Sequence, residues 1–335
     1  MTKKMMQGSQ AVAEGAIAAG LTFFAGYPIT PATEILNALI RRKEVKAFQF
    51  EDEIASANAI IGASMAGAKS MTATSGPGFS LMQESIGLAA MTRTPVVIVN
   101  VMRVGPSTGM PTMAAQGDIM QSRFGSHGDY FPIVFYPNSA SEIYTTTIHA
   151  FNAAEELQGP VILLLDALIS NLYETFEAPV IDIVPRKRKP MGTVGNRHLT
   201  GLVSEDGIPK TQDAGIYKEI IHDMQNAQEE TAAKHALYEY IKKDSDTLLI
   251  AFGATSRLLS DIGQHSIFRP IRMFPVIDEL KSIASKYKKI VVIEMNTGQY
   301  SQVIGQFLKR DVTTIPLLGG NIHLEEIRDG LSRLH

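Results

Sequence analysis

Short runs of consecutive apolar, mostly β-branched residues recur along the chain, with longer stretches rich in small residues between them. The clearest runs cover residues 96–99, 161–165, 248–251 and 290–293. Continuous apolar runs, as opposed to alternating ones, are typical of parallel strands that are covered on both faces of their sheet. Helical patterns lie between them, for example at residues 54–66. The pattern therefore predicts an α/β fold built on a parallel sheet.

A basic run bracketed by two prolines covers residues 185–190 and interrupts this pattern. We interpret it as a solvated linker, because the acidic balance of the chain argues against a nucleic-acid patch. A charged helix is predicted at about residues 218–242, followed by a second α/β unit. The sequence thus predicts a first domain at residues 1–200, and a linker helix with a smaller C-terminal α/β domain at residues 201–335.

The composition excludes several classes of protein. The net charge of the 335 residues is −3, so the chain has no electrostatic footprint for nucleic acid. With no cysteine it can hold neither a disulfide nor a cysteine-ligated iron–sulfur cluster. No apolar run approaches the roughly 20 residues that a bilayer requires, and no signal-peptide core follows the N-terminus. We therefore expect a cytoplasmic protein without a membrane partner.

The loop at residues 26–31 reads Gly-Tyr-Pro-Ile-Thr-Pro. Each proline fixes its own backbone and keeps the preceding residue out of the helical region, so Thr30 lies in a rigid segment. Such a loop can present the Thr30 hydroxyl to an anionic ligand. Alternatively, Thr30 or Thr33 caps the helix that is predicted to follow.

Three acidic residues, Glu51, Asp52 and Glu53, precede a helix rich in Ala, Gly and Ile. The helix dipole favours acidic residues at this end, which accounts for Glu51 and Asp52. It explains Glu53 less well, because a helix of small residues should bury the turn that it opens with. A carboxyl buried there can exchange a proton with a ligand nitrogen. Both interpretations of Glu53 stay open at this point.

Two further segments place unusual residues after predicted strands. Residues 75–78 form a Ser-Gly-Pro-Gly turn, whose glycines allow a ligand to approach the backbone closely. The turn lacks the dinucleotide-binding glycine pattern and the lysine of a P-loop. Arg103 follows the strand at residues 96–99, and a guanidinium at the carboxyl end of a parallel strand suits a carboxylate ligand. The alternative is that Arg103 pairs with an acidic residue of the chain.

Together, and in this order, these segments resemble the α subunit of 2-oxoacid:ferredoxin oxidoreductases. The likeness extends to residues 294–299, so it covers nearly the whole chain. The spacing of Glu53, Gly62 and the turn at residues 75–78 is also similar to that in acetolactate-synthase-like thiamine diphosphate enzymes. The resemblance implies a pyrimidine-binding-type parallel sheet domain followed by a smaller α/β domain.

The resemblance also implies a reaction and roles in it. The reaction is the oxidative decarboxylation of a 2-oxoacid to an acyl-coenzyme A, with electrons passed to ferredoxin. Glu53 would hydrogen-bond the pyrimidine nitrogen of thiamine diphosphate, and Thr30 and Arg103 would hold the carboxylate of the 2-oxoacid. The residues implied to contact the cofactor are Tyr27, Pro28, Ile29, Glu53, Ser75 and Gly76.

Two parts of such a site are missing from the sequence. The family holds the magnesium of its cofactor in a Gly-Asp-Gly motif, whereas residues 117–118 and 128–129 are Gly-Asp pairs that no second glycine follows. The absence of cysteine removes the cluster ligands as well. The resemblance therefore implies a β subunit that carries Mg²⁺ and a 4Fe–4S cluster, with or without a separate γ subunit.

The loop at residues 105–112 and the segment at residues 125–129 look more like the 2-oxoglutarate branch of the family than the pyruvate branch. A second substrate carboxylate would need a second cation or several hydroxyl groups. The candidates are Ser107, Thr108, Arg123 and His127. His127 can equally be a structural residue of a glycine-rich turn. A branched-chain 2-oxoacid is the alternative, for which an apolar pocket could be lined by Met110, Met113 and Met120.

Two other classes of function stay open. A self-sufficient thiamine diphosphate lyase or synthase is disfavoured, because the magnesium motif is missing. A non-catalytic scaffold subunit would keep the fold but would not need to bury the carboxyl of Glu53. The position of this side chain therefore separates a scaffold from a catalytic subunit.

Overall fold

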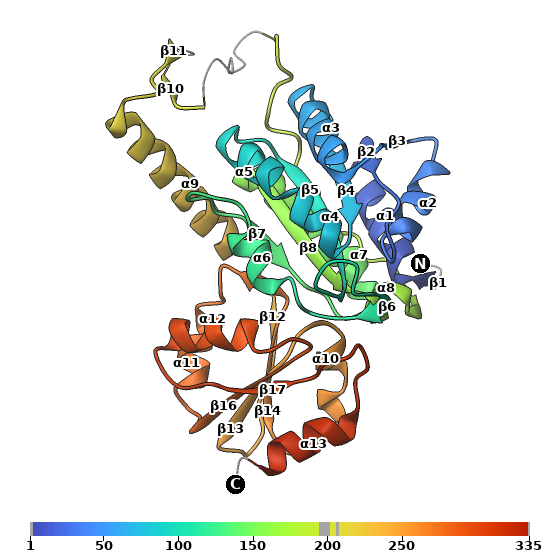
Figure 1. Ribbon diagram of the computed structural model, residues 1–335, viewed down its shortest axis with the longest axis vertical. Coiled ribbons are helices and arrows are strands. Elements are labelled where there is room, and N and C mark those ends of the chain that lie inside the picture. Colours follow the sequence, from blue (N-terminus) through green and yellow to red (C-terminus); the bar gives the residue numbers. More distant parts are fainter. Residues whose placement is uncertain (1–2, 194–201, 206–207, 334–335) are drawn as a thin grey trace.

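The computed structural model describes residues 3–193, 202–205 and 208–333, which form a larger and a smaller α/β domain (Figure 1). The larger sheet has seven strands in spatial order, and an eighth strand, β6 (Met110–Ala114), pairs antiparallel with β5. In order across the sheet the seven are β15 (Arg272–Phe274), β7 (Ile133–Phe135), β8 (Pro160–Asp166), β5 (Val96–Val104), β4 (Ser70–Thr74), β2 (Phe23–Gly26) and β3 (Lys46–Gln49).

The burial of the central strands accounts for their continuous apolar sequences. From β7 to β3 all neighbours pair in parallel, and β4, β5 and β8 are buried along almost their entire length. A strand that is covered on both faces carries apolar side chains at consecutive positions, which gives continuous apolar runs. The predicted parallel α/β fold is confirmed.

Helices cover this sheet, with α3 packed on β2 and β4, and α7 on β5 and β8. The helices are α1 (Gly8–Ala18), α2 (Thr33–Ile40), α3 (Glu53–Met65), α4 (Gly76–Leu81), α5 (Gln83–Met91), α6 (Ile119–Phe124), α7 (Ala140–Leu157), α8 (Ala167–Asn171) and α9 (Ala214–Lys234). Two small antiparallel pairs complete the domain: β1 (Lys4–Gln7) with β9 (Tyr173–Phe176), and β10 (Ser204–Glu205) with β11 (Ile208–Pro209).

The smaller domain is a five-stranded sheet, drawn in orange and red at the lower end of Figure 1. Its strands, in spatial order, are β12 (Tyr238–Ile241), β14 (Ser266–Pro270), β13 (Thr247–Ile250), β16 (Lys289–Glu294) and β17 (Thr313–Pro316). Its helices are α10 (Gly253–Arg257), the 3-10 helix η1 (Leu259–Ile262), α11 (Glu279–Ala284), α12 (Gln299–Leu308) and α13 (Leu324–Ser332). All its strand pairs are parallel except β12 with β14.

The long helix α9 packs on α7 and thus on the first domain. It begins where the Asp213 carboxylate accepts hydrogen bonds from the amides of Gly215 and Ile216, and Gln228 anchors it to the carbonyl of Pro132 at 2.7 Å. In the predicted division of the chain this helix belongs with the second domain, and the predicted boundary near residue 200 lies outside the described residues. Strand β15 also crosses between the parts, because it joins the larger sheet from the C-terminal half of the chain.

The interpretation of residues 185–190 as a solvated linker is wrong for the two arginines. Arg186 pairs with the buried Glu155 at 2.7 Å and donates to the carbonyl of Ser64 near the end of α3. Arg188 donates to the two carbonyls just beyond the end of α5. A guanidinium satisfies the free carbonyls of a helix C-terminus and complements its dipole. The arginines therefore clamp the ends of these helices, whereas the lysines between and beside them are exposed.

Candidate functional site

The four segments that the sequence analysis singled out come together at one edge of the larger sheet. Three of them follow β2, β3 and β4, and the fourth begins with Arg103 at the end of β5; these strands are neighbours in the sheet and run in parallel. The register places Gly26 opposite Gln49 and Thr74 opposite Asn100, so these strands end at the same edge. Ligands bind to open α/β sheets at this carboxyl edge.

Glu53 is the first residue of α3 and is 5% exposed. Its neighbour Asp52 is the N-cap and accepts a hydrogen bond from the amide of Ala55 at 2.7 Å. Capping thus accounts for Asp52 and leaves Glu53 free for another role. The Glu53 carboxyl lies so close to Gly78 that a Cβ atom at that position would be 2.3 Å from Glu53 Oε1. A scaffold subunit would not need to bury the carboxyl of Glu53, so this position favours a catalytic subunit.

Arg103 lies near the end of β5 and is 8% exposed. Its Nη1 donates a hydrogen bond of 2.7 Å to the backbone carbonyl of Thr30, and its buried Nε has no partner among the described residues. Burial lowers the pKa of Arg103, and the negative charges of Asp118 and Glu53 oppose that shift. No ion pair within 4.0 Å joins Arg103 to an acid in the described part of the chain. The guanidinium is therefore positioned but still has bonding capacity for a ligand.

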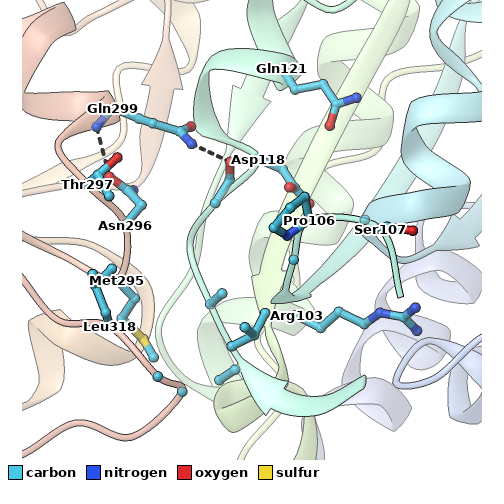
Figure 2. A pocket seen from close by; sticks show the side chains of 18 of the residues that line it. Arg103, Pro106, Ser107, Asp118, Gln121, Met295, Asn296, Thr297, Gln299 and Leu318 are labelled. Carbon is cyan, nitrogen blue, oxygen red and sulfur yellow. Dashed lines mark hydrogen bonds between the residues drawn. The ribbon is translucent and has the colours of Figure 1, made fainter. Parts of the chain in front are cut away.

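A cavity of about 660 Å³ lies between the two domains next to Arg103 (Figure 2). One wall comes from the first domain and the other from the segments after β16 and β17. Arg103 is the one cationic residue among those that line it. The side chains labelled in Figure 2 are Arg103, Pro106, Ser107, Asp118, Gln121, Met295, Asn296, Thr297, Gln299 and Leu318.

The residues expected to contact the cofactor surround this edge. Tyr27 is 38% exposed, and the loop after it is partly exposed. Ser75 is fully buried, and its Oγ has no hydrogen-bond partner in the described part of the molecule. Gly76 lines the cavity. Neither Thr30 nor Thr33 caps the following helix, since the N-cap of α2 is Ala32 and makes no side-chain hydrogen bond there.

The four candidates for a second substrate carboxylate are not brought together. Ser107 lines the cavity at the hairpin between β5 and β6, whereas Thr108 is exposed outside it. Arg123 donates to the carbonyl of Tyr130 at 2.8 Å, and its guanidinium lies over three aromatic rings. The His127 side chain is 88% exposed and lies 3.6 Å from a surface glutamate. Met110, Met113 and Met120 do not line the cavity either.

Asp118 is the residue of this site that the sequence analysis did not select. It lines the cavity, and its carboxylate accepts a hydrogen bond of 2.9 Å from the Nδ2 of Asn100. Burial raises the pKa of Asp118, while the hydrogen bond from Asn100 and the charge of Arg103 act in the opposite direction. In the sequence it belongs to a Gly-Asp pair that no second glycine follows. Its signal in the sequence is an acid that follows a glycine directly before a short helix.

Within the described residues there is no group of three or more His, Asp or Glu side chains that could hold a metal ion. Across those same residues, every helix is either too short or too polar to cross a lipid bilayer.

A parallel sheet that gathers a buried acid, an arginine and a glycine-rich turn at its carboxyl edge is the ligand-binding architecture of α/β enzymes. The chain belongs to the pyruvate flavodoxin/ferredoxin oxidoreductase family, thiamine diphosphate-binding, whose model matches residues 14–241. The predicted resemblance is confirmed.

The chain is similar to known proteins over nearly its whole length. It is 40% identical to the 2-oxoglutarate synthase subunit KorA of Methanocaldococcus jannaschii, over 97% of this chain and 98% of that protein. It is 34% identical to the ketoisovalerate oxidoreductase subunit VorB of Methanothermobacter marburgensis, over 100% of this chain and 97% of that protein.

Among the solved structures that share the fold, two illustrate different degrees of similarity. A 2-oxoglutarate:ferredoxin oxidoreductase from Magnetococcus marinus, solved with 2-oxoglutarate, coenzyme A and succinyl-CoA bound, superposes with a TM-score of 0.91 at 30% identity. The match covers 99% of this chain and 65% of that chain. A split-gene transketolase has a TM-score of 0.59 at 12% identity, which is a likeness of fold alone.

Proposed function

We propose that this chain is the α subunit of a 2-oxoglutarate:ferredoxin oxidoreductase and supplies the proton-handling acid and the carboxylate clamp of its active site. The single observation that carries the proposal is the Glu53 carboxyl, buried against Gly78 at the ligand-binding edge of the sheet. A buried acid with no role in capping is costly to keep unless it has a chemical function.

The residues at this edge suit the pyrimidine half of thiamine diphosphate. The Ser75 hydroxyl, which has no partner among the described residues, and the carboxyl of Glu53 offer hydrogen bonds to a nitrogen-containing ring, and Gly76 lets such a ring approach the backbone closely. When bound, the cofactor supplies a nucleophilic carbon and an electron sink for decarboxylation. Glu53 would hold and return a proton at the ring nitrogen, and Arg103 would orient the 2-oxoacid carboxylate for attack.

The rest of the site is proposed to come from a β subunit. The chain has no cysteine for a 4Fe–4S cluster and no Gly-Asp-Gly motif for Mg²⁺. We therefore propose that the β subunit binds both the cluster and Mg²⁺, together with the diphosphate of the cofactor. The assembled complex would use coenzyme A as the acyl acceptor and ferredoxin as the electron acceptor. A cytoplasmic location fits this chemistry.

The names of the relatives support 2-oxoglutarate as substrate, since the 2-oxoglutarate synthase subunit is more similar than the ketoisovalerate subunit. In this chain Arg103 contributes a cation and Ser107 a hydroxyl to the lining of the cavity, and both groups can bind carboxylates. A branched-chain 2-oxoacid is the second candidate, which the apolar cavity residues Leu317 and Leu318 favour.

The test is turnover of the reconstituted αβ complex with 2-oxoglutarate, 2-oxoisovalerate and pyruvate, with coenzyme A and ferredoxin. Glu53→Gln should lower kcat by about 100-fold or more, which is the usual contribution of proton transfer. The matched control is Glu51→Gln, because Glu51 is an exposed glutamate two residues away. Wild-type turnover in Glu53→Gln, or an αβ complex inactive with all three acids, would reject the proposed function.

A further inference from the structure

The segment after β16 is bound to the first domain by an array of buried amides. The amide of Met295 donates to Gln116 Oε1 at 3.0 Å, and the amide of Gln116 donates to the carbonyl of Met295 at 3.1 Å. Asn296 adds a hydrogen bond of 2.7 Å to the carbonyl of Gln116. Gln116 is fully buried and Asn296 is 6% exposed. Such a satisfied network fixes one arrangement of the two segments.

Gln299 extends this array to the turn that carries Asp118. Its Nε2 donates to the carbonyl of Gly117, and its Oε1 accepts from the amide of Met120 at 3.0 Å (Figure 2 shows the first of these bonds). Its own amide is held by Asn296 Oδ1 at 2.8 Å. One side chain of the C-terminal domain therefore hydrogen-bonds the backbone both before and after Asp118.

Asp118 and Arg103 line the same cavity with opposite charges, and Asp118 is the main charge that supports the buried guanidinium. Even so, no ion pair joins them among those found in the described residues. The side chain of Asn100 donates a hydrogen bond to the Asp118 carboxylate, and Gln299 holds the neighbouring backbone at Gly117. A direct pair would occupy the guanidinium, which could then no longer bind a ligand carboxylate bidentately.

We propose that Gln299 is a positioning residue that holds Asp118 back from Arg103, so that the guanidinium stays available for the carboxylate of the substrate. The C-terminal domain contributes to substrate binding through this restraint. This inference rests on the proposed function, in which Arg103 is the carboxylate clamp.

The test is a double-mutant cycle on the reconstituted αβ complex, with the KM for 2-oxoglutarate and kcat measured separately. Gln299→Leu removes both bonds to the turn, releases Asp118 toward Arg103 and should raise the KM about tenfold with little change in kcat. Asp118→Asn removes the competing charge and keeps the shape. On that background, Gln299→Leu should change the KM by less than about twofold, because contacting residues that act through each other are not additive.

The control variant is Gln225→Leu, which removes an exposed glutamine of α9 far from the cavity and should leave the KM unchanged. If Gln299→Leu does not assemble, Gln299→Glu replaces it, since it keeps the acceptor for the Met120 amide but puts a carboxylate against the Gly117 carbonyl. Hydrogen exchange of residues 116–121 gives a readout that is independent of turnover and should become faster in both variants.

An equal rise of the KM in the two backgrounds would mean that Gln299 has a general structural role and would overturn the inference. An unchanged KM in Gln299→Leu would overturn it as well. In both of these outcomes the wild-type complex still turns over 2-oxoglutarate, so the proposed function is not affected. An inactive wild-type complex would instead refute the proposed function.

Discussion

Gly78→Ala tests the placement of the Glu53 carboxyl without altering the acid itself. A Cβ atom at residue 78 would lie 2.3 Å from Glu53 Oε1, 2.6 Å from its Cγ and 2.2 Å from Thr74 Oγ1. Ordinary van der Waals contact begins at about 3.4 Å, so the carboxyl must move by about 1 Å. Both neighbouring side chains are buried, so neither can swing into solvent without leaving the site.

The expected effect on catalysis follows from this displacement. A misplacement of about 1 Å can cost about 100-fold in rate, because proton transfer needs hydrogen-bond geometry. Overpacking a well-filled interior costs about 1–3 kcal/mol of unfolding free energy, which most domains survive. Gly78→Ala should therefore give a folded complex with kcat lowered by about 100-fold.

The assay is steady-state turnover of the αβ complex with 2-oxoglutarate, together with urea unfolding of the α chain. Gly62→Ala is the matched control, because Gly62 lies in the same helix as Glu53 and an added Cβ there meets no atom within 4 Å. This control should keep its turnover and gain about 0.5–1 kcal/mol in stability. Wild-type kcat in Gly78→Ala would refute the argument that the narrow cradle places the Glu53 carboxyl.

Three further predictions follow from individual side chains. Arg103→Ala should raise the KM for the 2-oxoacid by at least tenfold; unchanged substrate kinetics would exclude Arg103 as the clamp. Arg186→Gln leaves Glu155, which is 2% exposed, without its ionic partner and should lower the unfolding free energy in urea by about 3 kcal/mol. Burial lowers the pKa of His149 to about 4 from an ordinary 6.5, so the unfolded chain binds a proton at His149 more tightly than the folded chain does. The stability that this shift contributes is complete above pH 6.5 and declines as the pH falls toward 4, by about 1.4 kcal/mol for each pH unit between those values. Wild type should therefore lose more stability than His149→Gln between pH 7 and pH 5. Equal losses in the two proteins would contradict the lowered pKa of His149 in the folded state.

Much of the first domain could be predicted from local sequence. Residues 161–165 form part of β8, and residues 96–99 begin β5, because a strand covered on both faces leaves an uninterrupted apolar run. The helix predicted at residues 54–66 is α3 within one residue at each end. The helix predicted at residues 218–242 is less accurate, since α9 covers Ala214–Lys234 and the chain has already entered β12 by Tyr238. A charged sequence has a weak apolar period, so the ends of its helix are poorly marked.

The site could be predicted in part. Glu53 and the turn at residues 75–78 follow strands of a parallel sheet, and Arg103 lies near the end of another, so the common edge of these strands could be predicted. The sequence could not show that Arg123 is engaged by Tyr130 and its aromatic neighbours, nor that Asp118 lines the cavity. A positive charge in a loop has the same sequence signal whether it faces a ligand or a carbonyl of its own chain.

The sequence by itself determined the layered α/β architecture and the chemistry at the strand ends, because both depend on residues that are close together in the chain. Only the tertiary structure decided which side chains face the cavity. The contact between Asn296 and Gln116 joins residues 180 positions apart. The ion pair of Arg186 with the buried Glu155 likewise depends on where distant helices end. Such contacts arise from the packing of whole elements against one another, and no local pattern of residues encodes them.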